Sequence, residues 1–179
     1  NERPEGEEIS LLVIHNISLP AGQFGTGDVD ALFCGTLDCC KHPSYQDLEG
    51  LRVSSHFFID RSGRLFQYVS CLDRAWHAGV SSYEGRENCN DFSIGVELEG
   101  TDSAPYEQAQ YETLGRLTDA LAEAYPIKYV TGHSMIAPLR KTDPGPAFDW
   151  LTYESLCTTG KRCVFLTSKR LIERFRPKF

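Results

Sequence analysis

Three residues that lie far apart in the chain have side chains suited to holding a metal ion. His15 ends a run of apolar residues, His133 ends a second short run, and Asp143 stands in a turn-rich segment with two prolines. Two imidazoles and one carboxylate are a common ligand set for a catalytic zinc ion, whose fourth position stays open to water. A structural zinc site is more often closed by four ligands, mostly thiolates. The trio therefore favours a hydrolytic centre with one Zn²⁺ per chain.

Each member of the trio also has an ordinary structural interpretation. A histidine at the end of a strand usually makes a common hydrogen bond, and an aspartate before Pro-Gly usually caps a turn through its own side chain. His56 and His77 are alternative metal ligands. His56 lies inside an apolar run, where a hydrogen-bonded core histidine is the usual case.

Two further residues could take part in hydrolysis. Glu97 lies in a segment whose apolar and polar residues alternate, so its side chain points away from the apolar face. A carboxylate there could accept a proton from an attacking water, and Glu99, on the same face, is the rival. Lys141 comes two residues before Asp143 and could stabilise an oxyanion. The alternatives are an exposed sheet edge for the glutamates and a solvated surface position for the lysine.

Other residues could line a substrate groove. Arg52 could hold a substrate carboxylate in a bidentate pair. Trp76 and His77 stand with small residues in one loop, which is typical of sugar and peptide grooves, although a lone tryptophan is more often part of a core. We expect the glycine-rich segment 22–27 and the segment 76–79 to form the walls of the groove.

The hydrophobic pattern predicts strands mixed with helices. Apolar runs and alternation predict strands over 9–17, 92–99 and 128–132, and a hairpin over 54–70 with its turn at 60–63. Helical spacing predicts a long helix over 107–125, a second over 148–157 and a short one over 29–34, with 38–50 irregular and 76–90 a long loop. The expected fold class is α/β (α+β), a single domain with a mixed central β-sheet and helices packed on it.

Composition excludes several classes of protein. The 179 residues suffice for one domain, and no apolar stretch approaches the length of a membrane helix. The net charge of −7 gives no basic footprint for nucleic acid. We therefore expect neither nucleic acid nor membrane as a partner. We also expect the protein to be a monomer. Basic residues gather near the end of the chain, so we expect a domain over 1–158 followed by a basic tail over 159–179 of unknown role.

The chain has seven cysteines, with irregular spacing. An odd number without a regular pattern is a poor disulfide framework, and free thiols in this number are typical of a reducing compartment. No signal peptide is evident, although the first residue is Asn1 rather than methionine. We therefore expect a cytoplasmic protein.

Several long strings carry a resemblance to a known family. They include Leu12-Val-Ile-His-Asn-Ile-Ser-Leu-Pro, Arg74-Ala-Trp-His-Ala-Gly-Val-Ser, Cys89-Asn-Asp-Phe-Ser-Ile-Gly-Val-Glu-Leu-Glu-Gly, Thr131-Gly-His and Ala137-Pro-Leu-Arg-Lys-Thr-Asp-Pro-Gly-Pro. Between about residues 11 and 150 the sequence resembles the zinc N-acetylmuramoyl-L-alanine amidases related to peptidoglycan-recognition proteins. Two positions depart from the family pattern: Ser134 follows His133 where a cysteine is usual, and Asn88 stands where an arginine is frequent.

The resemblance implies roles for the residues already singled out. It implies zinc ligation by His15, His133 and Asp143, acid/base catalysis by Glu97, oxyanion stabilisation by Lys141, and a substrate groove with Asn16, Arg52, Trp76 and His77. It also implies the reaction, which is hydrolysis of the amide bond between the lactyl group of (1,6-anhydro-)N-acetylmuramic acid and L-alanine. The biological setting would be cell-wall degradation, peptidoglycan recycling and β-lactamase regulation, with an anhydromuropeptide as substrate.

Three alternatives stay open at this point. A non-catalytic peptidoglycan-binding module is disfavoured because all three candidate ligands are present together with Glu97 and Lys141. A periplasmic amidase acting on polymeric peptidoglycan would use the same residues. A different zinc hydrolase, such as a peptidase, is a third candidate, since fold and metal do not fix the substrate.

Overall fold

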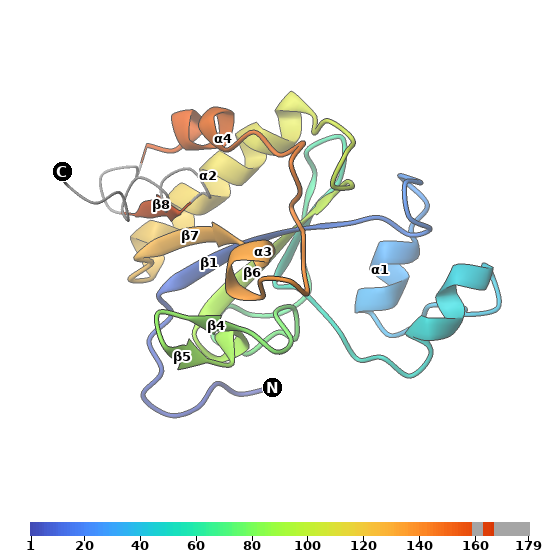
Figure 1. Ribbon diagram of the computed structural model, residues 1–179, viewed down its shortest axis with the longest axis horizontal. Coiled ribbons are helices and arrows are strands. Elements are labelled where there is room, and N and C mark those ends of the chain that lie inside the picture. The colour runs from blue at the N-terminus through green and yellow to red at the C-terminus, as the bar shows by residue number, and fades with distance from the viewer. Residues whose placement is uncertain (159–162, 167–179) are drawn as a thin grey trace.

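The fold is built on one mixed β-sheet, as the sequence predicts. The computed structural model describes residues 1–158 and 163–166. The strand order is β3-β2-β6-β1-β7-β8, and all neighbours are parallel except β2 and β3 (Figure 1). The strands are β1 (Leu11–Ile17), β2 (Phe57–Ile59), β3 (Leu65–Gln67), β6 (Ser93–Glu99), β7 (Tyr129–Gly132) and β8 (Val164–Leu166). The hairpin predicted over 54–70 is confirmed as β2 and β3.

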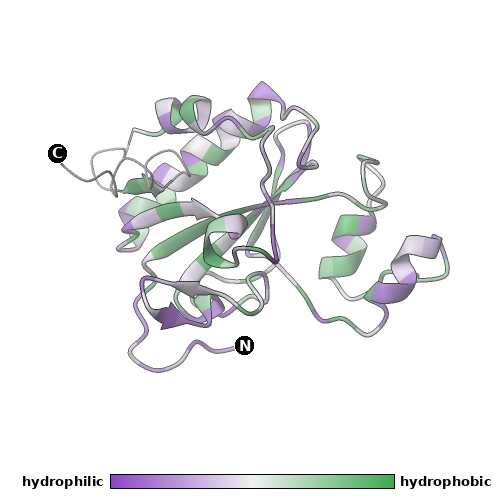
Figure 2. Cartoon of the chain, in the orientation of Figure 1, coloured by the Kyte–Doolittle hydropathy of each residue, from purple (hydrophilic) through white to green (hydrophobic). Residues whose placement is uncertain are grey.

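The two central strands, β1 and β6, are buried on both faces. On β1, Leu12 and Ile14 belong to the larger core cluster, whereas Leu11 and Val13 belong to the smaller one. A strand covered on both faces needs an apolar residue at nearly every position, which accounts for the continuous apolar run in the sequence. The central strands are accordingly mainly green in Figure 2.

Two helices cover the face of the larger core. Helix α2 (Gln108–Ala124) begins with a reciprocal hydrogen-bonded cap between Glu107 and Gln110. Its leucines at 114, 117 and 121 pack into the core, and α4 (Trp150–Leu156) lies against α2. The prediction for 107–125 is confirmed to within a residue at each end. The helix predicted over 148–157 is shorter, because the Asp149 side chain caps it by accepting from the backbone N–H groups of Leu151 and Thr152.

The opposite face is covered by short elements that the sequence did not predict. These are a small hairpin of β4 (Ser82–Tyr83) and β5 (Arg86–Glu87), the 3-10 turn η2 (Cys89–Asp91), and the single-turn helix α3 (His133–Ile136). They enclose the smaller core cluster, which includes Val13, Ala78 and Phe92. The candidate site lies on this face.

A separate excursion follows β1 and lies beside the sheet in Figure 1. It contains α1 (Asp28–Phe33), which the sequence predicts to within a residue, and the 3-10 turn η1 (Pro43–Leu48), which falls in the segment expected to be irregular. Buried Asp28 holds the excursion together, because its carboxylate accepts from the Tyr45 hydroxyl at 2.8 Å and pairs with the Lys41 ammonium.

The segment expected to be a tail contributes a strand to the sheet. Strand β8 pairs in parallel with β7, so Val164–Leu166 extends the sheet beyond residue 158. The segments 159–162 and 167–179 lie outside the described residues, and with them most of the predicted basic tail. Within the described part of the chain, no helix is long and apolar enough to cross a bilayer.

Candidate active site

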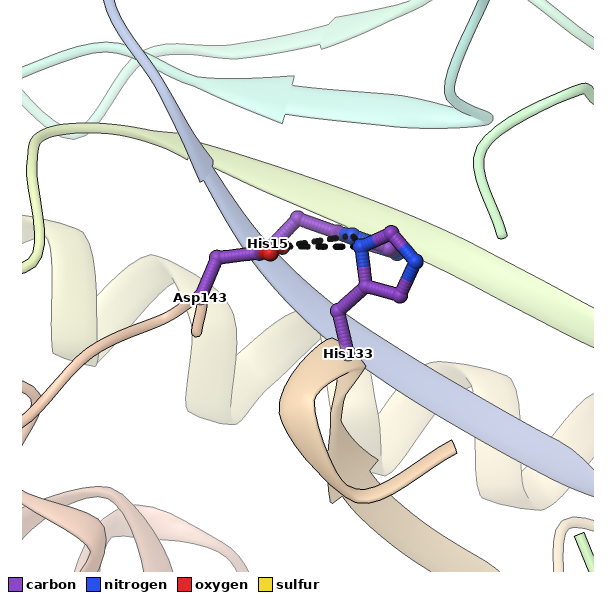
Figure 3. Close-up of side chains that lie close together, drawn as sticks. All are labelled: His15, His133 and Asp143. Carbon is purple, nitrogen blue, oxygen red and sulfur yellow. Dashed lines mark hydrogen bonds and ion pairs between the residues drawn. The ribbon is translucent and has the colours of Figure 1, made fainter. Parts of the chain in front are cut away.

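His15, His133 and Asp143 converge at the end of the central strands (Figure 3). The Nδ1 atoms of the two histidines are 3.0 Å apart, and Asp143 Oδ2 lies 3.0 Å from His15 Nδ1 and 3.1 Å from His133 Nδ1. His15 is near the carboxyl end of β1, and His133 directly follows the carboxyl end of β7. The carboxyl ends of parallel strands meet at one edge of a sheet, which is where ligands bind in open α/β folds.

Close packing holds the Asp143 segment against β7. A Cβ atom on Gly132 would lie 2.8 Å from Pro144 Cδ, so the absence of a side chain there lets the segment approach. The Pro144 carbonyl accepts from the Tyr106 hydroxyl at 2.8 Å and from the Asn16 amide at 3.1 Å. The position of the Asp143 carboxylate is therefore fixed by contacts that neighbouring residues make to the backbone of Pro144.

The protonation states of the trio suit a divalent cation. Burial lowers the pKa of His15 to about 4, so its imidazole is neutral at neutral pH. Burial alone would raise the pKa of the Asp143 carboxyl, but its close polar contacts with His133 and His15 outweigh burial and hold that pKa below its ordinary value. Neutral imidazoles and an ionised carboxylate are the forms that bind zinc.

The outer nitrogens of both histidines also have partners. His133 Nε2 lies 3.0 Å from the backbone oxygen of Ala78, and His15 Nε2 lies 2.9 Å from His77 Nδ1. Metal-ligating histidines almost always donate their other ring N–H in this way. The donor set, the neutral imidazole of His15 and the outer contacts of both histidines thus fit a three-ligand metal site.

Glu97 lies beside the trio as a buried carboxylate. Within the described residues, its Oε2 atom has no hydrogen-bond partner. Burial raises the pKa of Glu97 well above its ordinary value, Asp143 raises it further, and Lys141 opposes the shift. A carboxylate with a raised pKa can both accept and return a proton near neutral pH.

The rival Glu99 is occupied elsewhere. Its carboxylate accepts from the backbone N–H of Gly25 at 2.5 Å and from that of Arg61 at 3.1 Å. These bonds anchor the loop after β1 to the end of β6. The geometry therefore favours Glu97 over Glu99 as the acid/base candidate.

An open cavity of about 540 Å³ lies over the trio. Glu97 and Lys141 both line it, as do Asn16, Trp76 and His77. Lys141 is exposed to solvent where it lines this cavity. The cavity can thus hold a substrate between a metal site, a buried carboxylate and a cation.

The four residues predicted for the substrate groove have different surroundings. The Asn16 amide donates to Asp102 Oδ1 at 2.9 Å as well as to Pro144, so it also supports the Asp143 segment. Trp76 is 41% exposed, with the Arg74 guanidinium 4.3 Å from its ring centroid.

Arg52 is exposed and lines a neighbouring cavity of about 320 Å³, which it shares with Trp76 and Lys141. His77 lines both cavities, but its Nε2 lies 3.2 Å from Ser93 Oγ and its Nδ1 contacts His15. Both of its ring nitrogens are thus engaged within the protein.

The predicted walls are partly wrong. The segment 76–79 contributes Trp76 and His77 to the cavity over the trio, but Gly25 and Gly27 line a different cavity, because Glu99 draws their loop away. Leu32 and Phe33 of α1 form that side instead. Their apolar side chains carry no sequence signal that distinguishes a cavity wall from a core.

His56 is a core histidine rather than a ligand. It is fully buried, its Nδ1 accepts from the Gly95 N–H at 3.0 Å, and its Nε2 lies 3.1 Å from the Asp73 carbonyl. The sequence reasoning missed Asn90, whose side-chain oxygen accepts from the backbone N–H groups of His77 and Ala78 and so fixes their loop.

Comparison with known proteins agrees with this geometry. A family model described as N-acetylmuramoyl-L-alanine amidase matches residues 5–146. The 1,6-anhydro-N-acetylmuramyl-L-alanine amidase AmpD of Citrobacter freundii is 57% identical over 158 residues, which are 87% of this chain and 84% of that protein. The AmpD of Escherichia coli K12 is 57% identical over 156 residues, 86% of this chain and 85% of the relative.

Comparison with solved structures also identifies amidases as similar proteins. The crystal structure of a selenomethionine derivative of AmpD matches with a TM-score of 0.85 at 56% identity, over 88% of this chain and 89% of that one. A complex of the N-acetylmuramyl-L-alanine amidase AmiD from E. coli with the substrate anhydro-N-acetylmuramic acid-L-Ala-D-γ-Glu-L-Lys matches at 0.68 and 27% identity, over 98% of this chain and 67% of that one. The chain belongs to the N-acetylmuramoyl-L-alanine amidase family and is an amidase.

Proposed function

We propose that this amidase is zinc-dependent and cleaves the bond between the lactyl group of 1,6-anhydro-N-acetylmuramic acid and L-alanine. The observation that carries the proposal is the convergence of His15, His133 and Asp143, whose ligand atoms lie within 4.8 Å of one another beneath the open cavity. These residues would hold one Zn²⁺ per chain. When bound, the metal supplies Lewis-acid activation of the amide carbonyl and of water.

The protein's own residues account for the proton movements. Glu97 accepts the proton of the attacking water, since it is a carboxylate that lines the cavity over the trio and whose pKa is raised by burial. The same carboxyl then returns the proton to the leaving nitrogen of L-alanine. Its buried Oε2 atom has no hydrogen-bond partner among the described residues, so no protein group competes with water or substrate for it.

Lys141 supplies the positive charge for the oxyanion. Lys141 lines the cavity over the trio and belongs to the segment that carries Asp143, so a scissile carbonyl bound in the cavity would lie between its ammonium and the trio. A fixed cation near a developing negative charge lowers the barrier more than it stabilises the neutral amide. Asn16, Arg52 and Trp76 would contact the sugar and the peptide on either side.

The substrate class is supported by the relatives. Proteins at 51–57% identity carry the name 1,6-anhydro-N-acetylmuramyl-L-alanine amidase, and the more distant AmiD binds an anhydromuramyl peptide. A rigid bicyclic sugar loses little freedom on binding, which favours it over the flexible reducing sugar. We infer the same anhydromuropeptide substrate for this chain, which acts as a monomer in peptidoglycan recycling.

The cytoplasm is the compartment we propose. Thiols such as Cys34, Cys39, Cys71 and Cys89 are free, as is typical of a reducing environment. Soluble turnover fragments rather than intact wall would be the substrates there. Removal of such fragments would link the enzyme to β-lactamase regulation if they act as inducers.

A chromatographic assay with three substrates tests the proposal. Anhydromuramyl-peptide, muramyl-peptide and purified sacculi are supplied to the zinc-loaded enzyme side by side. We expect the highest kcat/KM on the anhydromuramyl-peptide and little release from sacculi. Comparable rates on all three, or a preference for sacculi, would point instead to a cell-wall amidase and would remove the cytoplasmic placement. Binding of muropeptide without turnover would identify a non-catalytic module.

A further inference from the structure

We propose that His77 is a positioning residue that, together with Ser93, holds His15 in the tautomer and orientation needed to bind the metal; this inference rests on the proposed zinc site. The chain of contacts runs from His15 Nε2 to His77 Nδ1 at 2.9 Å, and from His77 Nε2 to Ser93 Oγ at 3.2 Å. The role differs from a substrate contact because it acts on the ligand, not on the muropeptide.

The two candidate histidine ligands are oriented by different means. His133 Nε2 faces the Ala78 carbonyl, which can only accept, so this contact favours the tautomer of His133 with its proton on Nε2 and its Nδ1 lone pair toward the trio. His15 Nε2 faces an imidazole nitrogen, which can donate or accept. The tautomer of His15 therefore depends on that of His77.

The two hydrogen bonds that link His15, His77 and Ser93 can run in either direction. Only donation from His15 toward Ser93 leaves His15 Nδ1 unprotonated and able to bind a cation. His15 must carry its proton on Nε2 and donate it to the lone pair of His77 Nδ1. His77 must then carry its own proton on Nε2 and donate it to the Ser93 hydroxyl oxygen. With the reverse arrangement, His15 Nδ1 would be protonated and could not bind the cation.

The backbone of β6 is shaped to admit the His77 ring. A Cβ atom on Gly95 would lie 2.5 Å from both Cγ and Nδ1 of His77, a distance that no side chain could tolerate without displacing the ring. Ser93, Gly95 and Glu97 alternate onto the same face of the strand. The ring therefore lies over Gly95, between the serine that accepts from it and the strand that carries His15.

The loop that carries His77 is fixed from the other side. Asn90 Oδ1 accepts from the backbone N–H of His77 at 3.1 Å and from that of Ala78 at 2.8 Å. One anchored dipeptide thus provides the outer partner of both histidine ligands, a side chain for His15 and a carbonyl for His133. Such outer partners typically change metal affinity by about 10–100-fold when they are removed.

The test is the zinc dissociation constant, measured by competition with a chromophoric chelator and without substrate. His77→Phe keeps a ring over Gly95 but offers no acceptor to His15, so we expect zinc to bind about 10–100-fold more weakly. His77→Asn places an amide oxygen near the position of Nδ1 and should retain most of the affinity. Gly95→Ala should weaken zinc binding by displacing the ring, whereas His42→Asn, at the partly buried histidine that caps η1, should leave it unchanged.

A second measurement reads the tautomer directly and needs no variant. Long-range ¹⁵N–¹H spectra of the zinc-loaded wild type should show His77 protonated on Nε2 and not on Nδ1. A Nδ1-protonated His77, or a His77→Phe protein with wild-type zinc affinity, would overturn the inference while leaving the zinc site itself intact. A wild type that binds no zinc would instead remove the proposed function on which the inference rests.

Discussion

His15 and Glu97 are register partners on the adjacent parallel strands β1 and β6. Directly paired residues of neighbouring strands point to the same face of a sheet, so this register alone brings a candidate metal ligand beside the candidate acid/base group. A slip of one residue would turn Glu97 into the larger core and Val96 toward the cavity. The distance between the two functions is thus set by backbone hydrogen bonds in the most buried part of the molecule.

The first prediction concerns the metal ligands. We expect purified wild type to contain one zinc ion per chain, and His15→Ala, His133→Ala and Asp143→Ala to lose most of it, since each removal leaves only two ligands. Elemental analysis of the folded proteins is the measurement. His56→Asn is the matched control, because His56 is fully buried in hydrogen bonds of its own. A full zinc complement in the trio variants and its loss in the control would contradict the assignment.

The second prediction separates Glu97 from Glu99. Glu97→Gln should keep the fold and the metal but lower kcat by about two to four orders of magnitude, the usual range for a general acid/base. Glu99→Gln should act on stability instead, because an amide replaces a carboxylate that accepts from Gly25 and Arg61.

We expect Glu99→Gln to lower the free energy of unfolding by about 1–3 kcal/mol, as for a buried polar group left without its partner. Steady-state kinetics and urea denaturation of both variants distinguish the two effects. An inactive but fully stable Glu99→Gln beside a normally active Glu97→Gln would reverse the roles.

The third prediction concerns Arg52 and the peptide. Arg52 is exposed and lines the neighbouring cavity that it shares with Trp76 and Lys141, but not the cavity over the trio. A contact to a peptide carboxylate there is similar in the ground state and the transition state, so Arg52→Ala should raise KM and leave kcat nearly unchanged. The assay compares substrates with and without that carboxylate. The idea is abandoned if Arg52→Ala affects both substrates equally.

The fourth prediction is a pH dependence of stability. Burial lowers the pKa of His56 to about 4, against 6.5 in an unfolded chain. Above pH 6.5 both states are neutral; between pH 6.5 and 4 only the unfolded chain takes up the proton, so stability falls as the pH is lowered. His56→Asn should reduce this slope by up to about 1.4 kcal/mol per pH unit. Urea unfolding of the metal-free proteins at pH 7 and pH 5 measures it, and equal slopes would show that His56 does not titrate in this way.

Much of the site was predictable because its residues follow regular elements. Strand alternation on β6 places Glu97 and Glu99 on one face, and the long apolar run of β1 ends near His15. Choosing between the two glutamates from the residues alone was not possible, because the choice depends on the Gly25 N–H, which reaches Glu99 from a loop 74 residues away in sequence.

Other features of the structure could not be predicted from the sequence, for similar reasons. The short β4–β5 hairpin and α3 have too few residues for a hydrophobic period to show. The engagement of both His77 nitrogens depends on the absence of a side chain at Gly95, a close approach between distant segments that no local pattern records. The same holds for Gly132 and Pro144, whose contact places Asp143.

The most direct test of the account is a zinc titration of chelator-treated enzyme, with the products of an anhydromuramyl-peptide identified by mass spectrometry. We predict no cleavage without metal, a rise in rate that is linear up to one equivalent of zinc, and products equal to anhydro-N-acetylmuramic acid and the free peptide with L-alanine at its amino terminus. Cleavage by the metal-free protein, a plateau only at two equivalents, or cleavage at any other bond would contradict it.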